Sequence, residues 1–282
     1  MVFDGESWRK DEKLYRAIKH ARFDSLVLAG TQKEEIRADA HRFFAARDLY
    51  RQHGVPWKRG VIFYGPPGNG KTHALKALVN DLGLPCLYVK SFRNSYGPDE
   101  ESMAAVFGQA RKSAPCVLVF EDLDALISKR NRSFFLNELD GFAGNDGILT
   151  LATSNHPKRL DPAIVDRPSR FDRKYEFGLP GLPERLIFLG QWSRSLEPEM
   201  RLSPAGLRAV AEASAGFSFA YLKELCLTGL MRWIDRPGGG GEAAMDAIMQ
   251  DTAALLAGQV APLKKRHGTH QTSDELAEAG TR

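Results

Sequence analysis

Short apolar runs alternate with helix-length segments through the middle of this chain. The five runs are Val61–Tyr64, Cys86–Val89, Val117–Phe120, Ile148–Ala152 and Tyr175–Phe177. Runs that are apolar at nearly every position are typical of strands buried on both faces, and strands that alternate with helices form parallel sheets. The pattern therefore predicts an α/β fold, in which helices cover both faces of a parallel sheet in a three-layer sandwich.

The strand pattern stops after the fifth run, and the chain beyond it reads as helical. One helical pattern begins at Pro183, and a second begins at Ser203-Pro204, where a serine N-cap precedes a proline in the first turn. Two more follow at Ser218–Trp233 and Glu242–Leu256. These segments predict a small all-helical domain behind the sheet.

Four parts are expected along the chain. They are a helical or linker segment at 1–56, an α/β domain at 57–180, a helical lid domain at 181–258 and a polar, disordered tail at 259–282. Residues 1–56 are charged and helix-prone, with aromatic anchors such as Trp8 and Phe43. This segment is too short to be a sizeable domain of its own, so we expect it to act as a linker.

Composition and charge narrow the class of protein. With 43% hydrophobic and 26% charged residues, the chain lies near the average for soluble globular proteins. The net charge of +4, from 39 Lys+Arg and 35 Asp+Glu, is weak evidence for nucleic-acid binding. No apolar run approaches the roughly 20 residues of a membrane helix, and Cys86, Cys116 and Cys226 lack metal or disulfide spacing. We expect a cytoplasmic protein with no membrane span.

A phosphate-binding pattern directly follows the first of these runs. Residues 65–72 read Gly-Pro-Pro-Gly-Asn-Gly-Lys-Thr, and a helical stretch comes next, which is the context that the P-loop requires. Glycines let backbone N–H groups turn toward phosphates, and the helix adds its positive N-terminal end. Lys71 supplies a charge to the phosphates, and Thr72 supplies a hydroxyl to Mg²⁺. The predicted ATP-binding residues are Gly65, Pro66, Pro67, Gly68, Asn69, Gly70, Lys71, Thr72 and His73.

Two carboxylates end the third run. The strand Val117–Phe120 leads into Glu121 and Asp122, which is the Walker B arrangement of an apolar strand followed by acids. In such sites one carboxylate helps hold Mg²⁺ and the other orients the attacking water. We assign Glu121, with Thr72, to the metal and Asp122 to the water. Asp124 could instead cap the following helix.

The fourth run is followed by Asn155 and then by an arginine-rich segment. An amide at the end of a buried strand lies where it can position water beside the γ-phosphate, although a lone Asn there is more often a turn residue. Arg167 and Arg170 lie within 160–173. Arginines at a subunit edge can stabilise transition-state charge on a neighbour's ATP. Surface arginines paired with nearby aspartates would give the same pattern.

These elements, in this order, resemble the AAA ATPases of the AAA+ group. Leu136–Phe142 is similar to the family's inter-subunit signalling segment, and Gly216–Ala220 to its lid motif. The resemblance covers about residues 22–235. It implies a P-loop NTPase sandwich with a helical lid, assembled as a homo-oligomeric ring, usually a hexamer. It also implies Mg²⁺-dependent ATP hydrolysis that remodels a protein, with Arg167 and Arg170 as arginine fingers on the adjacent protomer.

Several positions depart from the family pattern. The order Glu121-Asp122 replaces the usual Asp-Glu, so either the shorter Asp122 lies about one methylene closer to the water or Glu121 takes part of that catalytic role. That order and the run 53–60 resemble the mitochondrial translocases that mature the Rieske protein, although this chain lacks their membrane helix. One extra residue, Val165 or Asp166, precedes Arg167.

The family's central pore loop has a weaker counterpart here. Ser95-Tyr96-Gly97 stands one residue out of register with it. Tyr96 or Phe92 could grip a polypeptide, or could be an ordinary aromatic residue of a surface loop.

Two other functions fit part of the pattern. A nucleic-acid machine of the same superfamily would carry an arginine in the lid motif where Ala220 stands, and its only basic spot here is Lys129–Arg132. We therefore expect a protein client and no nucleic acid. A nucleotide switch or small-molecule kinase would not need the arginine-rich segment 160–173. The absence of an Asn-Lys-x-Asp motif argues against a GTPase.

Overall fold

The computed structural model describes residues 1–94, 97–141, 144–165, 167, 169–236 and 244–258. The chain divides into two compact units, Met1–Gly178 and Leu179–Arg282. The first holds a seven-stranded sheet with the order β2-β1-β4-β5-β6-β3-β7. Its strands are β1 (Val2–Phe3), β2 (Trp8–Arg9), β3 (Lys58–Tyr64), β4 (Cys86–Val89), β5 (Cys116–Phe120), β6 (Ile148–Ser154) and β7 (Arg173–Glu176).

Each of the five predicted apolar runs forms or overlaps one strand, from β3 to β7. Their pairings are all parallel, and β3, β5 and β6 lie at the centre of the sheet. Every residue of β5 and β6 is buried. The predicted α/β sandwich is therefore confirmed, because strands covered on both faces need apolar side chains at successive positions.

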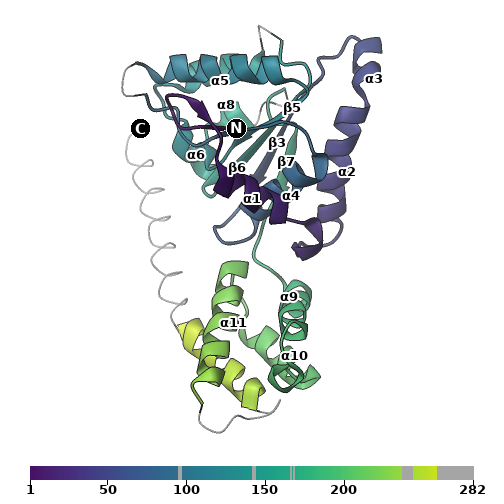
Figure 1. Cartoon of the computed structure of the whole chain (residues 1–282), viewed down its shortest axis with the longest axis vertical. Coiled ribbons are helices and arrows are strands. Elements are labelled where there is room, and N and C mark those ends of the chain that lie inside the picture. Colours follow the sequence, from purple (N-terminus) through teal and green to yellow (C-terminus); the bar gives the residue numbers. More distant parts are fainter. Residues whose placement is uncertain (95–96, 142–143, 166, 168, 237–243, 259–282) are drawn as a thin grey trace, which may run out of the picture. The chain divides into compact units, whose positions relative to one another are not determined.

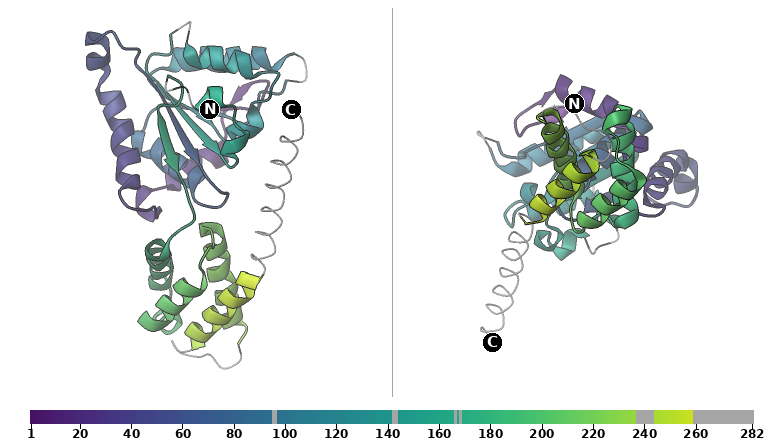
Figure 2. Two further views of the ribbon diagram at one scale, coloured as in Figure 1. Left: turned by 180° about the vertical axis from the view of Figure 1, so that it is seen from behind. Right: turned by 90° about the horizontal axis from the view of Figure 1, so that it is seen from below.

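Helices cover both faces of this sheet (Figures 1 and 2). One face packs against α2 and α4, and the other packs against α5 and α7. The helices of this unit are α1 (Glu12–His20), α2 (Gln32–Ala45), α3 (Arg47–Gln52), α4 (Lys71–Leu82), α5 (Asp99–Ser113), α6 (Leu123–Leu126), α7 (Arg132–Asp140) and α8 (Pro162–Val165), with 3₁₀ turns at Phe23–Ser25 and Pro157–Arg159.

The first residues of the chain belong to this sandwich, which differs from the expected linker at 1–56. β1 pairs with β4 in parallel and β2 pairs with β1 antiparallel, so residues 2–9 extend one edge of the sheet. Phe3 is 2% exposed, and its ring centroid lies 5.2 Å from that of Trp8. Two-residue strands carry too short an apolar pattern to be recognised from sequence.

The second unit is helical. It contains α9 (Leu182–Arg194), a 3₁₀ turn (Pro198–Met200), α10 (Pro204–Ala213), α11 (Phe219–Ile234) and a helix at 244–258. The hydroxyls of Ser203 and Ser218 accept hydrogen bonds from the first turns of α10 and α11, as N-caps do. The four helices share one apolar core. Among the described residues, no helix is long and apolar enough to cross a membrane.

Candidate functional site

The predicted phosphate loop connects β3 to α4. Gly65 has φ +136°, and a Cβ at this position would lie 2.5 Å from the carbonyl oxygen of Phe177. Gly70 has φ +88° and is the N-cap residue of α4. Both positions therefore require glycine, for close approach in one case and for a left-handed backbone in the other.

Lys71 is held inside this loop. It is 5% exposed, and its ammonium group donates hydrogen bonds to the carbonyl oxygens of Gly65 at 2.7 Å and Pro66 at 2.8 Å. Burial lowers the pKa of Lys71, and the negative charges of Asp122 and Asp124 partly oppose that shift. A buried cation that is satisfied only by neutral carbonyls gains strongly from an anionic partner.

Glu121 lies beside Thr72 and Tyr88. The hydroxyl of Thr72 donates to one carboxylate oxygen of Glu121, and the hydroxyl of Tyr88 donates to the other. Tyr88 is on β4, opposite Val119 of β5. Because side chains alternate along a strand, Val119 and Glu121 share a face, and Tyr88 reaches that face from the neighbouring strand. Our sequence analysis did not identify Tyr88, whose role becomes visible only once β4 and β5 are paired.

Asp122 and Asn155 meet at the ends of adjacent parallel strands. The side-chain amide of Asn155 donates to Asp122 at 2.7 Å, and the backbone N–H of Asp122 donates to the hydroxyl of Thr153 at 3.0 Å. Asp122 has φ +52°, in the left-handed region that a non-glycine residue rarely occupies. Such strain is common where a side chain must be aimed at a reacting group.

Asp124 and His73 have other partners. Asp124 accepts a hydrogen bond from the hydroxyl of Ser154 at 2.7 Å, while Asp122 is the N-cap residue of α6. The imidazole Nε2 of His73 lies 3.0 Å from the hydroxyl of Ser25. His73 thus connects the phosphate loop to the chain segment that precedes α2.

A cavity of about 270 Å³ collects most of the predicted residues. Its walls are the phosphate loop from Pro67 to His73, together with Asp122, Thr153 and Asn155. Glu121 is outside this lining but is bonded to Thr72, which is part of it. The structure therefore brings the phosphate loop, the two acids and the amide to one edge of the sheet.

Arg167 and Arg170 lie elsewhere, and they differ from each other. Arg170 is 7% exposed and donates to Asp140 at 3.0 Å and 2.7 Å and to the carbonyl of Ala163. The hydrogen bond and charge of Arg170 hold the pKa of Asp140 below its ordinary value. The side chain of Arg167 is 62% exposed and has one longer contact with Asp140, at 3.4 Å. Neither arginine lines the cavity of its own chain.

The structure describes only one of the two aromatic residues that were predicted to contact a polypeptide in the pore. Phe92 is 2% exposed and packs in the core beside Phe120 and Phe135, so the expectation that it grips a polypeptide from a surface loop is wrong. Its apolar ring is stabilised by burial against other rings. Tyr96 lies outside the described residues, as do Phe142 and Asp166.

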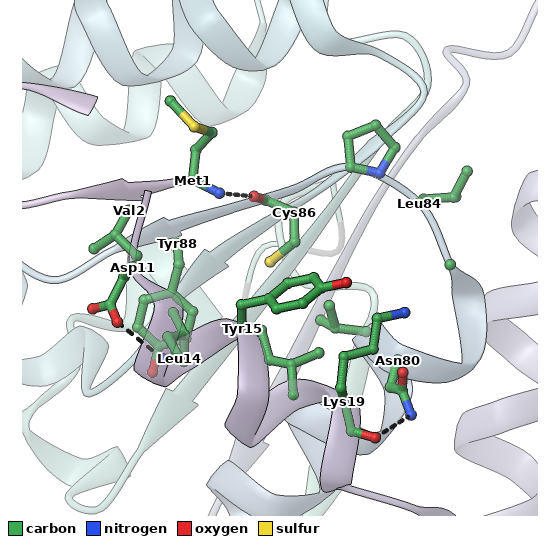
Figure 3. A pocket seen from close by; sticks show the side chains of 14 residues that line it. Met1, Val2, Asp11, Leu14, Tyr15, Lys19, Asn80, Leu84, Cys86 and Tyr88 are labelled. Atoms are coloured by element: carbon green, nitrogen blue, oxygen red, sulfur yellow. Dashed lines mark hydrogen bonds between the residues drawn. The ribbon is translucent and has the colours of Figure 1, made fainter. Parts of the chain in front are cut away.

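A second cavity, of about 400 Å³, lies beside α1 and β4 (Figure 3). Its walls include Tyr15, Lys19, Asn80, Cys86 and Tyr88. Tyr88 thus belongs both to this cavity and to the Glu121 site. Burial raises the pKa of the Cys86 thiol to about 12, which disfavours its thiolate form.

Comparison with known proteins agrees with this geometry. Residues 61–179 match the family described as "ATPase family associated with various cellular activities (AAA)". The chain is 36% identical over 222 residues to an ATP-dependent zinc metalloprotease FtsH of Acidothermus cellulolyticus, covering 72% of this chain and 32% of the relative.

Other relatives show a similar extent of match. FtsH 3 of Symbiobacterium thermophilum is 31% identical over 225 residues, which cover 73% of this chain and 35% of the relative. A probable inactive chloroplastic relative, FTSHI 2 of Arabidopsis thaliana, is also 31% identical, covering 74% of this chain and 25% of the relative. The chain spans about a third or less of these relatives. It carries an ATPase domain of the AAA family, within the wider AAA+ group.

Proposed function

We propose that this chain binds and hydrolyses ATP in a homo-oligomeric ring, most simply a hexamer, and uses that energy to remodel or unfold a protein. One observation carries the proposal: a single cavity joins the phosphate loop from Pro67 to His73 to Asp122 and Asn155, at the ends of β5 and β6. The relatives whose names include ATP-dependent proteases support protein as the class of client.

The oxygen donors in the cavity and directly beside it fit ATP with Mg²⁺. Thr72 offers a hydroxyl oxygen and Glu121 a carboxylate, the hard oxygen ligands that Mg²⁺ prefers. Among the described residues, no group of three or more His, Cys, Asp or Glu side chains could hold a metal by itself. That agrees with a Mg²⁺ site in which phosphates and waters supply the other ligands. Bound Mg²⁺ supplies positive charge to the phosphate oxygens.

Three side chains of this chain would act on the phosphates and the water. Lys71 would exchange its two carbonyl partners for phosphate oxygens, which relieves its buried charge. Asp122 would accept a hydrogen bond from the attacking water, and Asn155 would hold Asp122 in place. Asp is one methylene shorter than the usual Glu, so the left-handed backbone at Asp122 is part of how it reaches the water.

The two arginines have different roles in the proposed ring. Arg167 is exposed and is our choice for the finger that reaches a neighbour's ATP. Arg170 would have to leave Asp140 and Ala163 to act in that way. We therefore propose that Arg170 first of all holds the segment that presents Arg167.

Two finer assignments belong to the proposal. The Glu121-Asp122 order supports a place near the Rieske-protein translocases, and three free cysteines, two of them buried, support a cytoplasmic location. The 282 residues contain no His-Glu-x-x-His motif. We therefore extend to this chain only the ATP-dependent part of the relatives' names.

The test is the ATPase rate per subunit as protein concentration rises. We expect a specific activity that climbs and saturates, because assembly would bring Arg167 to a neighbour's site. Lys71→Ala should abolish hydrolysis, whereas Lys76→Ala, on the same helix but outside the cavity, should not. Lys71→Ala hydrolysing ATP at the wild-type rate would refute the proposed site.

A further inference from the structure

The cavity of about 400 Å³ beside α1 and β4 has no part in the proposed ATPase reaction (Figure 3). Its volume lies within the range of about 300–1,000 Å³ in which proteins hold small molecules. One wall is α1, a second is the end of α4 with the connection at 83–85, and a third is formed by Val2 of β1 and Tyr88 of β4, which pair in the sheet. The cavity shares no lining residue with the nucleotide cavity.

Most of this lining is apolar. Val2, Val79 and Tyr88 are 1%, 4% and 2% exposed. The half-buried side chains of Leu14 and Ile18 line the cavity from α1. Apolar walls are stabilised when an apolar ligand displaces water from them. The walls therefore suit a ligand with an apolar body.

Two charged groups of the lining already have partners. Asp11 accepts a hydrogen bond from the backbone N–H of Leu14 at 2.9 Å and is paired with Lys90 at 3.0 Å. The amino group of Met1 donates to the carbonyl oxygen of Cys86 at 3.0 Å. The acid of the lining is thus neutralised within its own chain, and it does not repel an anionic ligand strongly.

Lys19 is the cation of the lining that has no acidic partner. It is exposed on α1 and makes no ion pair with another described residue. Its ammonium nitrogen lies 5.8 Å from the ring centroid of Tyr15, and Figure 3 shows the two side chains next to each other. A cation–π contact at an exposed site is weaker than a charge-assisted hydrogen bond to a carboxylate. Lys19 therefore favours a ligand with one negative charge.

We propose that this cavity binds a small monocarboxylate with an apolar body. The apolar body lies between α1 and α4, and the carboxylate accepts a hydrogen bond from the ammonium group of Lys19. The charge of Lys19 complements that of the ligand, and the apolar walls exclude more highly charged anions, whose further charges would be buried without partners. This binding step goes beyond the proposed function and does not depend on it.

Tyr88 connects this site with the proposed Mg²⁺ site. Its ring lines the cavity, while its hydroxyl donates to Glu121. A ligand in the cavity leaves the ring less room to move, so it should favour the arrangement in which Tyr88 reaches Glu121. The ligand and Mg²⁺-ATP should then raise each other's affinity by the same factor. This coupling rests on the proposed function.

The experiment measures binding of three probes to the full chain by isothermal titration calorimetry, without nucleotide. The probes are octanoate, hexanoate and octan-1-ol. We expect octanoate to bind about tenfold more tightly than hexanoate, because two more methylenes are buried. At low salt it should also bind about tenfold more tightly than octan-1-ol, which lacks the charge.

Two variants with the same change in net charge locate the carboxylate. Lys19→Gln should remove the preference for octanoate over octan-1-ol, whereas Lys19→Arg should keep most of it. Lys13→Gln, at an exposed lysine of the same helix outside the lining, should keep all of it. Far-UV circular dichroism checks that the variants fold.

A further titration tests the coupling through Tyr88. Saturating octanoate should tighten the binding of a fluorescent ATP analogue with Mg²⁺ about threefold in the wild type. Tyr88→Phe should still bind octanoate, but octanoate should no longer change its affinity for the analogue. An affinity that octanoate leaves unchanged in the wild type would overturn the coupling.

Two results would overturn the site itself. They are equal binding of octanoate and octan-1-ol by the wild type, and a preference for octanoate that Lys19→Gln leaves unchanged. Octanoate binding is measured without nucleotide. A chain that hydrolyses ATP but shows no preference for octanoate would therefore refute this inference alone, whereas a preference without ATP binding would refute the proposed function.

Discussion

Both carboxylate oxygens of Glu121 accept hydrogen bonds, one from Thr72 and one from Tyr88. Glu has one more rotatable bond than the Asp that is usual at this position, so its carboxylate is less constrained by its own backbone. The Tyr88 hydroxyl supplies the missing constraint from the adjacent strand.

Removing this hydroxyl should loosen the metal site without creating a cavity. We expect Tyr88→Phe to reduce the gain in ATP affinity that Mg²⁺ provides by about tenfold, the value of one hydrogen bond to a charged group. Binding of a fluorescent ATP analogue, with Mg²⁺ and with EDTA, measures this gain. Tyr15→Phe is the matched control, because Tyr15 lines the same neighbouring cavity and makes no bond to Glu121 in the described structure. An equal loss in both variants would contradict the role of Tyr88.

The two arginines should fail in different ways when they are removed. Arg167→Ala should lower hydrolysis by about 10³-fold while ATP still binds, because an exposed finger acts on transition-state charge.

Arg170→Ala should instead lower the free energy of unfolding by about 2–3 kcal/mol, since Asp140 and Ala163 lose their partner. ATPase assays and urea denaturation separate the two effects. Unchanged stability of Arg170→Ala would show that its buried contacts matter little.

At the scale of helices and strands, most of the functional side chains are positioned by the ends of adjacent strands and by the first residues of helices. β5 and β6 run parallel, so Asp122 and Asn155, which follow them, meet at one edge of the sheet. α4 begins inside the phosphate loop at Lys71, directly after its N-cap residue Gly70. In the second unit, Ser203 both caps α10 and donates to Asp246 of the helix at 244–258, at 2.5 Å. One residue therefore connects two helices of the second unit.

Loss of this serine should loosen the helical unit locally. We expect Ser203→Ala to lower the protection of α10 amides against hydrogen exchange by about tenfold, which is about 1.4 kcal/mol and within the range of an N-cap. Ser203→Thr keeps a hydroxyl at the cap and should retain most of the protection. If both variants exchange like the wild type, the cap bond contributes little to the unit.

The whole first unit behaves as one sandwich that includes the start of the described chain. β1 and β2 complete the sheet beside β4, and Phe3 packs in the same core as Phe92 and Phe107. Since Tyr88 of β4 contacts Glu121, the edge formed by residues 2–9 is part of what supports the nucleotide site.

A substitution of a buried residue in this edge strand tests whether residues 2–9 support the nucleotide site. Phe3→Ala should lower the free energy of unfolding by about 3 kcal/mol, because a large buried ring is lost. Tryptophan fluorescence and ATP-analogue binding should be lost in one transition with urea. Leu49→Ala is the control, since Leu49 is 58% exposed on α3. A separate early transition, with ATP binding intact, would make residues 1–9 an independent appendage.

The sequence alone determined the features that depend on neighbouring residues. The phosphate loop, the apolar strands β3 to β7 and the serine cap of α10 all follow from local chemistry or from periodicity, and the structure places them as predicted. The acids after β5 and the amide after β6 were each predicted to act at the phosphates, and the structure brings Asp122 and Asn155 together.

Only the tertiary structure decided features that join distant parts of the chain. The bond from Tyr88 to Glu121 depends on the pairing of β4 with β5, and the burial of Arg170 depends on Asp140, which lies 30 residues earlier. Phe92 reads as a loop aromatic but packs in the core, and β1 joins the sheet through only two residues. Such contacts are set by how elements pack, and no single stretch of sequence carries that information.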